Sequence, residues 1–153
     1  MKTVDAEHFE ALKRESVAQL LFKCARLVNE QAIARVNRKA GAAPPLRAAH
    51  TALLPHLSSE GVRGADLAKK LGVTKQAVSQ LLTELEEWGV VEQVADPKDG
   101  RAKLVRFTAK GEKGVLHGLT VLRELERELS DKIGKRRMQE LHTALLALEK
   151  ALL

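Results

Sequence analysis

The chain has 153 residues, of which 44% are hydrophobic, and its formal net charge is +6. This apolar content excludes a disordered polymer, and the length suits one compact domain with attachments. Asp5, Glu7 and Glu10 interrupt the opening residues where a secretory signal would be apolar, and no stretch has the roughly 20 apolar residues of a membrane span. We therefore expect a cytoplasmic protein, and its single cysteine agrees with a reducing compartment.

The first section of the chain, residues 1–43, is expected to be helical. Between Asp5 and Lys39 there is no proline or glycine and apolar residues recur at helical spacing, which predicts one long amphipathic helix or two in tandem. The sequence GAAPP ends this section, and Pro45 is well placed to start a new helix. The expected inner face of that helix consists of Leu46, Ala49, Leu53, Leu54 and Leu57. Pro55 lies inside the pattern, so we expect a kink or fraying there.

A pair of short helices and a β-hairpin are expected next. The apolar face of the first helix consists of Leu67, Ala68 and Leu71. This helix should stop at Gly72, because glycine readily adopts the left-handed conformation that ends helices. Thr74 can cap the second helix, TKQAVSQLLTELEE, which should end before Gly89. Two β-rich runs, VVEQVA and AKLVRFT, then flank DPKDGR, whose Asp, Pro and Gly residues predict a hairpin tip.

Residues 109–153 are expected to form two helices that follow Thr108 and are separated by a break at Ile133 and Gly134. The first carries a stripe of Leu116, Leu119, Leu122, Leu125 and Leu129. The second carries a heptad-like seam of Met138, Leu141, Leu145, Leu148 and Leu152. A central unit of about 65 residues is too small to cover these helical arms, so a second copy of the chain should bury them. The residues expected at this dimer contact are Leu20, Leu141, Leu145 and Leu148.

The second helix of the pair has two different faces. One face, which must pack inward, consists of Val78, Leu81, Leu82 and Leu85. The other carries side chains able to reach base edges and phosphates from the major groove, namely Thr74, Lys75, Gln76, Ser79, Gln80 and Thr83. Glu84, Glu86 and Glu87 come later and DNA would repel them, so the first half of the helix should enter the groove. The alternative interpretation is an ordinary solvated face.

The hairpin adds weight to the DNA-binding interpretation. Its tip and second strand carry Lys98, Arg101, Lys103 and Arg106 against Asp99. A basic hairpin directly after a helix-turn-helix is typical of a wing, and Arg101 is expected to enter the minor groove, where narrow A·T-rich segments attract guanidinium groups. Asp99 is expected to accept hydrogen bonds from the Arg101 guanidinium and hold it in place. The alternative is an ordinary charged turn.

Composition alone does not identify this segment as DNA-binding. Residues 61–108 hold eight Lys or Arg against seven Asp or Glu, so the argument depends on where the charges lie. The chain has three phenylalanines, one tryptophan and no tyrosine, from which a stacking platform for single strands is hard to build. Double-stranded DNA is therefore the expected partner.

The sequence GADLAKKLGVTKQAVSQLLTELEEWGVVEQVADPKDGRAKLVRFTAKG resembles the DNA-binding lobe of the MarR family of bacterial regulators. The Asp-x-Arg signature of that family's wing matches Asp99, Gly100 and Arg101, and Asp96 and Pro97 also fit. The resemblance implies a homodimer held by the terminal helices, two recognition helices that read a palindromic operator, and release by a small-molecule effector. Many relatives carry arginine where this chain has glutamine at position 80.

These observations predict a mainly α fold with a small β-hairpin wing. Residues 1–43 would form an N-terminal dimerisation helix region, residues 44–108 a winged helix-turn-helix DNA-binding lobe, and residues 109–153 the C-terminal dimerisation helices. The expected function is a sequence-specific transcriptional regulator, a repressor that acts as a homodimer on a palindromic operator. The alternative is a winged-helix module that binds DNA without sequence preference, or binds another protein.

Sensor and enzyme chemistry find little support in the sequence. Cys24 is a candidate oxidant sensor, but it lies on the apolar stripe of its helix, and the chain lacks the tyrosine that hydrogen-bonds an oxidised sulfur in peroxide-sensing relatives. The five histidines include no pair at helical ligand spacing, so no metal site is expected. His50 and His56 are expected to be surface residues. No phosphate-binding glycine loop or nucleophile elbow occurs, so we expect no catalytic residue and no cofactor.

Overall fold

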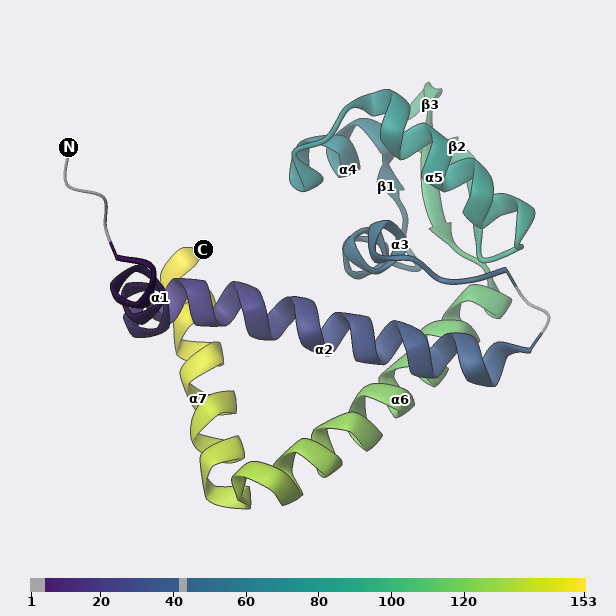
Figure 1. Cartoon of the computed structure of the whole chain (residues 1–153). Coiled ribbons are helices and arrows are strands. Elements are labelled where there is room, and N and C mark those ends of the chain that lie inside the picture. The colour runs from purple at the N-terminus through teal and green to yellow at the C-terminus, as the bar shows by residue number, and fades with distance from the viewer. Residues whose placement is uncertain (1–4, 42–43) are drawn as a thin grey trace.

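The computed structural model describes residues 5–41 and 44–153, which form helices and one small antiparallel sheet (Figure 1). This confirms the predicted mainly α fold with a small β wing. The N-terminal elements are α1 (Ala6–Glu15), α2 (Val17–Ala40), α3 (Ala48–Leu53) and a 3-10 turn (Leu54–His56). The central elements are β1 (Val62–Arg63), α4 (Gly64–Leu71), α5 (Lys75–Glu87), β2 (Val91–Asp96) and β3 (Asp99–Phe107). The C-terminal helices are α6 (Ala109–Ile133) and α7 (Lys135–Leu152).

The N-terminal section forms two helices in tandem, the second of the two predicted alternatives. They meet at Ser16, whose hydroxyl accepts a hydrogen bond from the Gln19 amide at 3.3 Å and so caps α2. α2 then continues for 24 residues and ends at Gly41, which has a φ of 62°. Residues 42–43 of the GAAPP interruption lie outside the described part of the chain.

The connection from α2 to α3 differs from the prediction, because Pro45 does not start a helix. The segment ahead of α3 is tied instead to α2: the Asn37 side chain accepts from the Leu46 amide at 2.8 Å and donates to the Leu46 carbonyl at 3.0 Å. α3 begins at Ala48, after an Arg47 backbone in the extended conformation. The expected disturbance at Pro55 is present, since α3 gives way to a 3-10 turn that contains this proline.

The predicted helix pair is present as α4 and α5. Gly72 ends α4 in the left-handed conformation, with φ 64° and ψ 29°. The Thr74 hydroxyl accepts from the Ala77 amide at 3.1 Å and caps α5. Both predictions are confirmed. They were possible from the sequence because each depends on a local signal within four residues of the helix end.

The sheet has one more strand than the sequence predicted. Its order is β1-β3-β2, with β1 pairing Val62 to Val105 and Arg63 to Leu104. A strand of two residues has no periodicity, so only tertiary pairing reveals it. β2 and β3 form the expected hairpin, but β3 already begins at Asp99, which confines the turn to Pro97 and Lys98.

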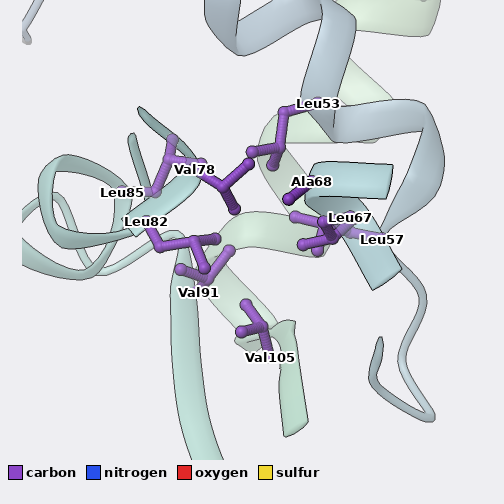
Figure 2. Packing of buried hydrophobic residues seen from close by; sticks show 9 residues of the cluster. All are labelled: Leu53, Leu57, Leu67, Ala68, Val78, Leu82, Leu85, Val91 and Val105. Atoms are coloured by element: carbon purple, nitrogen blue, oxygen red, sulfur yellow. The ribbon is translucent and has the colours of Figure 1, made fainter. Parts of the chain in front are cut away.

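One hydrophobic core lies inside the lobe formed by α3, α4, α5 and the sheet (Figure 2). It consists of Leu53, Leu57, Leu67, Ala68, Val78, Leu82, Leu85, Val91 and Val105. In Figure 2, Val78 of α5 points toward Leu53 of α3. The inward face predicted for α5 is therefore confirmed for Val78, Leu82 and Leu85, while Leu81 is half-buried against the core.

α6 leaves the lobe and crosses the C-terminal part of α2, after which the two helices diverge (Figure 1). Thr108 caps α6, accepting from the Gly111 amide at 3.0 Å. Two ion pairs join the helices: Arg35 donates twice to the Glu128 carboxylate at 2.7 Å, and Lys39 contacts Glu124 at 2.8 Å. The predicted break follows Ile133, at Gly134 with a φ of 97°.

The apolar stripes of the terminal helices are largely uncovered in the single chain. In α6 the buried apolar side chains are Val121 and Leu125, whereas Leu116 is 64% exposed. α7 has no buried residue. In the described part of the chain, no helix is both long and apolar enough to cross a membrane.

Candidate nucleic-acid interface

The polar face predicted for the recognition helix lies on the surface at the N-terminal half of α5. All six of its predicted residues are exposed, namely Thr74, Lys75, Gln76, Ser79, Gln80 and Thr83. The first turn of α5 contains no acidic residue. The amides and the positive end of the helix dipole at this terminus therefore face no carboxylate of the turn itself, which suits the approach of a phosphate. The Thr83 hydroxyl donates to the Ser79 carbonyl at 3.0 Å within the helix.

The acidic second half of α5 is engaged with the rest of the lobe. Glu84 is half-buried and contacts Arg47 and His50. Two hydrogen bonds lower the pKa of the Glu84 carboxyl below its ordinary value. The bond from the Arg47 guanidinium has the larger effect, and the bond from His50 has the smaller one. Glu86 accepts a hydrogen bond from the Gln93 side chain at 2.9 Å. These two carboxylates thus have hydrogen-bond partners within the protein, which the sequence analysis did not predict.

The wing presents four predicted residues, Lys98, Asp99, Arg101 and Lys103, and all four are exposed. The role predicted for Asp99 is wrong in one respect. Its carboxylate accepts from the backbone N–H of Arg101 at 3.2 Å instead of gripping the guanidinium. Asp99 therefore shapes the backbone after the turn, as Asp commonly does two residues before the amide it binds.

A buried carboxylate directly before the turn of the wing was not predicted as a site residue. Asp96 is only 6% exposed, accepts from the Lys98 amide at 2.8 Å and accepts from Arg63 Nε at 2.8 Å. The Lys98 N–H and the Arg63 guanidinium lower the pKa of this carboxyl. Arg63 also lies 3.9 Å from the Asp99 carboxylate. Arg63 and Asp96 are 33 positions apart, so only the pairing of β1 with β3 brings them together.

Arg106, counted among the hairpin cations, has a partner within the sheet. Its Nε donates to Glu92 at 2.8 Å, and the two residues lie opposite each other on β3 and β2. Cross-strand pairs of opposite charge stabilise a sheet. The cations that the wing offers to a ligand are therefore Lys98, Arg101 and Lys103.

The structure corrects two further expectations. Cys24 is exposed in the single chain, although its apolar surroundings in sequence suggested a core position. His50, expected at the surface, is completely buried, and its ring packs edge-on against Trp88 with centroids 4.7 Å apart. His56 is exposed, as expected. Within the described residues, no group of three or more His, Cys, Asp or Glu side chains is arranged to hold a metal ion.

The four residues predicted for dimer contact lie on the surface of the arms. Their exposed fractions are 44% for Leu20, 47% for Leu141, 40% for Leu145 and 39% for Leu148. They are part of a wider distribution, because every large hydrophobic residue recorded as exposed lies on α1, α2, α6 or α7 or at the C-terminus, with the exception of Val73.

Residues 46–102, which span the lobe from the segment before α3 into β3, match the model of the MarR family. Over these residues the chain is similar to the MarR family, and its fold is the winged helix-turn-helix fold of that family. No match to a curated protein is found.

Solved structures of other regulatory proteins share this fold over nearly the whole chain. MepR of Staphylococcus aureus, a transcription regulator of the multidrug efflux pump MepA, is 20% identical with a TM-score of 0.67, covering 90% of this chain and 99% of MepR. The transcriptional repressor CouR, bound to a 23-mer DNA duplex, is 19% identical with a TM-score of 0.67, covering 97% and 99%. The Mycobacterium tuberculosis MarR family protein Rv2887, in complex with salicylic acid, is 24% identical with a TM-score of 0.66, covering 87% and 96%.

Proposed function

We propose that this protein is a transcriptional regulator that binds duplex DNA sequence-specifically as a homodimer, and that it represses by occupying a palindromic operator. The observation that carries the proposal is the exposed first turn of α5, which has no acidic residue, together with a wing whose cations Lys98, Arg101 and Lys103 are exposed. CouR, whose fold is similar, is a repressor bound to a DNA duplex, which supports this function.

The residues fall into two roles in this proposal. Lys75, Gln76, Ser79 and Gln80, with Thr74 and Thr83 at either end, would contact base edges and phosphates in the major groove. Lys98, Arg101 and Lys103 would contact the neighbouring minor groove and its phosphates, while Asp99 shapes the backbone that presents them. Gln80 favours adenine, whose N6 and N7 it can engage with both ends of its amide.

A homodimer is supported by the apolar surface of the arms. One chain leaves α7 without a buried residue and keeps leucines such as Leu141 and Leu145 more than a third exposed. Burying this much exposed apolar surface between two chains would stabilise a dimer. We therefore retain the division into an N-terminal dimerisation region over 1–43, a DNA-binding lobe over 44–108 and C-terminal dimerisation helices over 109–153.

A small-molecule effector is the proposed release signal. Rv2887 binds salicylic acid, which is an aromatic carboxylate. In the present chain a shallow depression lies between α2 and α3, lined by Ala25, Arg26, Asn29, Ala48, Thr51 and Ala52. Its position beside the connection to the lobe suits a ligand that biases the orientation of the lobe.

The experiment that tests the function compares two duplexes at matched salt: the DNA upstream of the protein's own coding sequence, and a random duplex of the same length. Sequence-specific binding predicts at least about a thousandfold preference for the operator, with half-sites about 34 to 36 Å apart in a footprint. Equal affinity for both duplexes would replace the regulator by a winged-helix module without sequence preference.

A further inference from the structure

The Glu84 carboxylate connects the recognition helix to the segment in front of α3. Its Oε2 accepts from Arg47 Nη2 and lies 3.1 Å from His50 Nε2. These partners are 37 and 34 positions earlier in the chain. The contact therefore joins two elements that sequence alone does not place together.

His50 is fixed on three sides. The backbone N–H of Arg47 donates to its Nδ1 at 3.0 Å, which leaves Nε2 as the N–H that donates to Glu84. The ring is 0% exposed and packs against Trp88, the residue that follows α5. A buried imidazole N–H without an acceptor is costly, so the His50 ring strongly favours the present position of Glu84.

The same segment is attached to α2 by the two hydrogen bonds between the Asn37 side chain and the Leu46 backbone. Leu46 immediately precedes Arg47. A continuous series of hydrogen bonds and one ion pair thus runs from Asn37 on α2, through the backbone at Leu46 and Arg47, to Glu84 on α5.

We propose that Glu84 is a positioning residue of the recognition helix, held by Arg47 and His50 so that α2 sets the orientation of α5. The proposal rests on the DNA-binding role given above. Gln80 lies one turn before Glu84 on the same helix, so a tilt of α5 about Glu84 moves the predicted base-contacting side chains directly. Contacts to α2 from a partner subunit or an effector would reach the DNA interface by this route.

The first test uses the sign of an effect on DNA affinity. If Glu84 were only a negative charge near DNA, Glu84→Gln would tighten binding, as Glu87→Gln should, since Glu87 is exposed on the same helix. The proposal predicts that Glu84→Gln instead weakens operator binding about threefold to tenfold, with little change for a random duplex, because non-specific binding tolerates a misplaced helix. Tightening in both variants would overturn it.

A double-mutant cycle tests whether Arg47 acts through Glu84. Arg47→Met and Glu84→Gln should each weaken operator binding, and the double variant should lose no more than the weaker-binding single variant. Arg47→Lys keeps a cation at this place and should restore most of the affinity, whereas a purely structural loss would not be rescued by charge. Additive losses in the cycle would contradict the proposed link.

A third measurement requires no DNA. The chain has one tryptophan, so intrinsic fluorescence reports the surroundings of Trp88 and His50. Asn37→Ala and Arg47→Met should change the emission maximum or its quenching by acrylamide, whereas Gln31→Ala, at an exposed position on α2, should not. Circular dichroism confirms that each variant is folded. Unchanged emission in Asn37→Ala and Arg47→Met would refute the proposed connection from α2 to α5, even if operator binding is found. Altered emission without operator binding would refute only the DNA-binding role.

Discussion

The Val90 carbonyl oxygen occupies the space that a β-carbon on Gly111 would need. This contact is the junction between the lobe and the C-terminal arm, and hydrogen bonds from Thr108 to the Gly89 and Val90 carbonyls reinforce it. Only glycine permits this approach, because any larger side chain must push α6 away from the loop that precedes β2.

Gly111→Ala should therefore destabilise the protein by on the order of 3 kcal/mol, since the added methyl group meets backbone that cannot rotate away. Urea denaturation followed by circular dichroism measures this. The matched control is Gly114→Ala, three residues further along α6, where nothing lies within 4 Å of the new β-carbon. That variant should be more stable than the wild type by about 0.5 to 1 kcal/mol. Equal effects at the two positions would mean that the junction is looser than described.

Arg101→Ala should weaken operator binding by about 1 to 3 kcal/mol without changing the fold or the oligomeric state. Removing a side chain that contacts phosphate or the minor groove should also reduce the steepness of the salt dependence. The control is Arg106→Ala, because Arg106 is paired with Glu92 across the strands and should contribute less to DNA affinity. Fluorescence anisotropy with a labelled operator at several salt concentrations gives both quantities. An unchanged affinity for Arg101→Ala would remove the wing from the proposed interface.

The Asp96 carboxylate predicts a specific dependence of stability on pH. The Lys98 N–H and the Arg63 guanidinium lower its pKa in the folded protein. The stabilisation is therefore complete above the pKa of the unfolded chain, near 4, and is lost as the pH falls through the lower folded pKa.

Asp96→Asn should be less stable than the wild type at pH 7, and the difference in unfolding free energy should shrink between about pH 5 and pH 2. Urea titrations at a series of pH values measure the difference. Asp131→Asn is the control, because Asp131 is exposed on α6. A difference for Asp96→Asn that stays constant down to pH 2 would show that its carboxylate charge contributes nothing.

Charged residues at Leu141 and Leu145 should abolish the dimer and operator binding together, since α7 offers its leucines only to a partner. Size-exclusion chromatography with light scattering measures the mass. Val73→Glu is a matched control for oligomeric state, because Val73 is 45% exposed and lies outside the arms. A monomeric Leu141→Glu/Leu145→Glu variant that still bound the palindrome with full affinity would contradict the proposed architecture.

The features that the sequence predicted correctly depend on signals within a few residues of one another. Thr74 caps α5, Gly72 ends α4 and Gly134 separates α6 from α7, and each of these needs only its own neighbours. The exposed polar face of α5 follows from helical periodicity alone, because Val78, Leu82 and Leu85 define the opposite side.

The features that were missed depend on contacts between distant segments. Asp96 directly precedes the hairpin turn in sequence, and its burial requires Arg63 from β1. His50 looked like a surface residue because the Glu84 and Trp88 that enclose it come from another helix. The start of α3 was placed at Pro45 on local propensity, whereas the hydrogen bonds from Asn37 keep that segment extended. Tertiary contacts decided each of these cases.

Arg63 belongs to three substructures at once. It is the last residue of β1, the residue immediately before α4 and the ion-pair partner of Asp96, which directly precedes the turn of the wing. The wing and the first helix of the helix-turn-helix are therefore coupled through the Arg63 side chain as well as through the core. If the lobe binds DNA as proposed, this coupling keeps the wing at a fixed distance from the recognition helix. DNA that must be bent to match that distance should then bind more weakly.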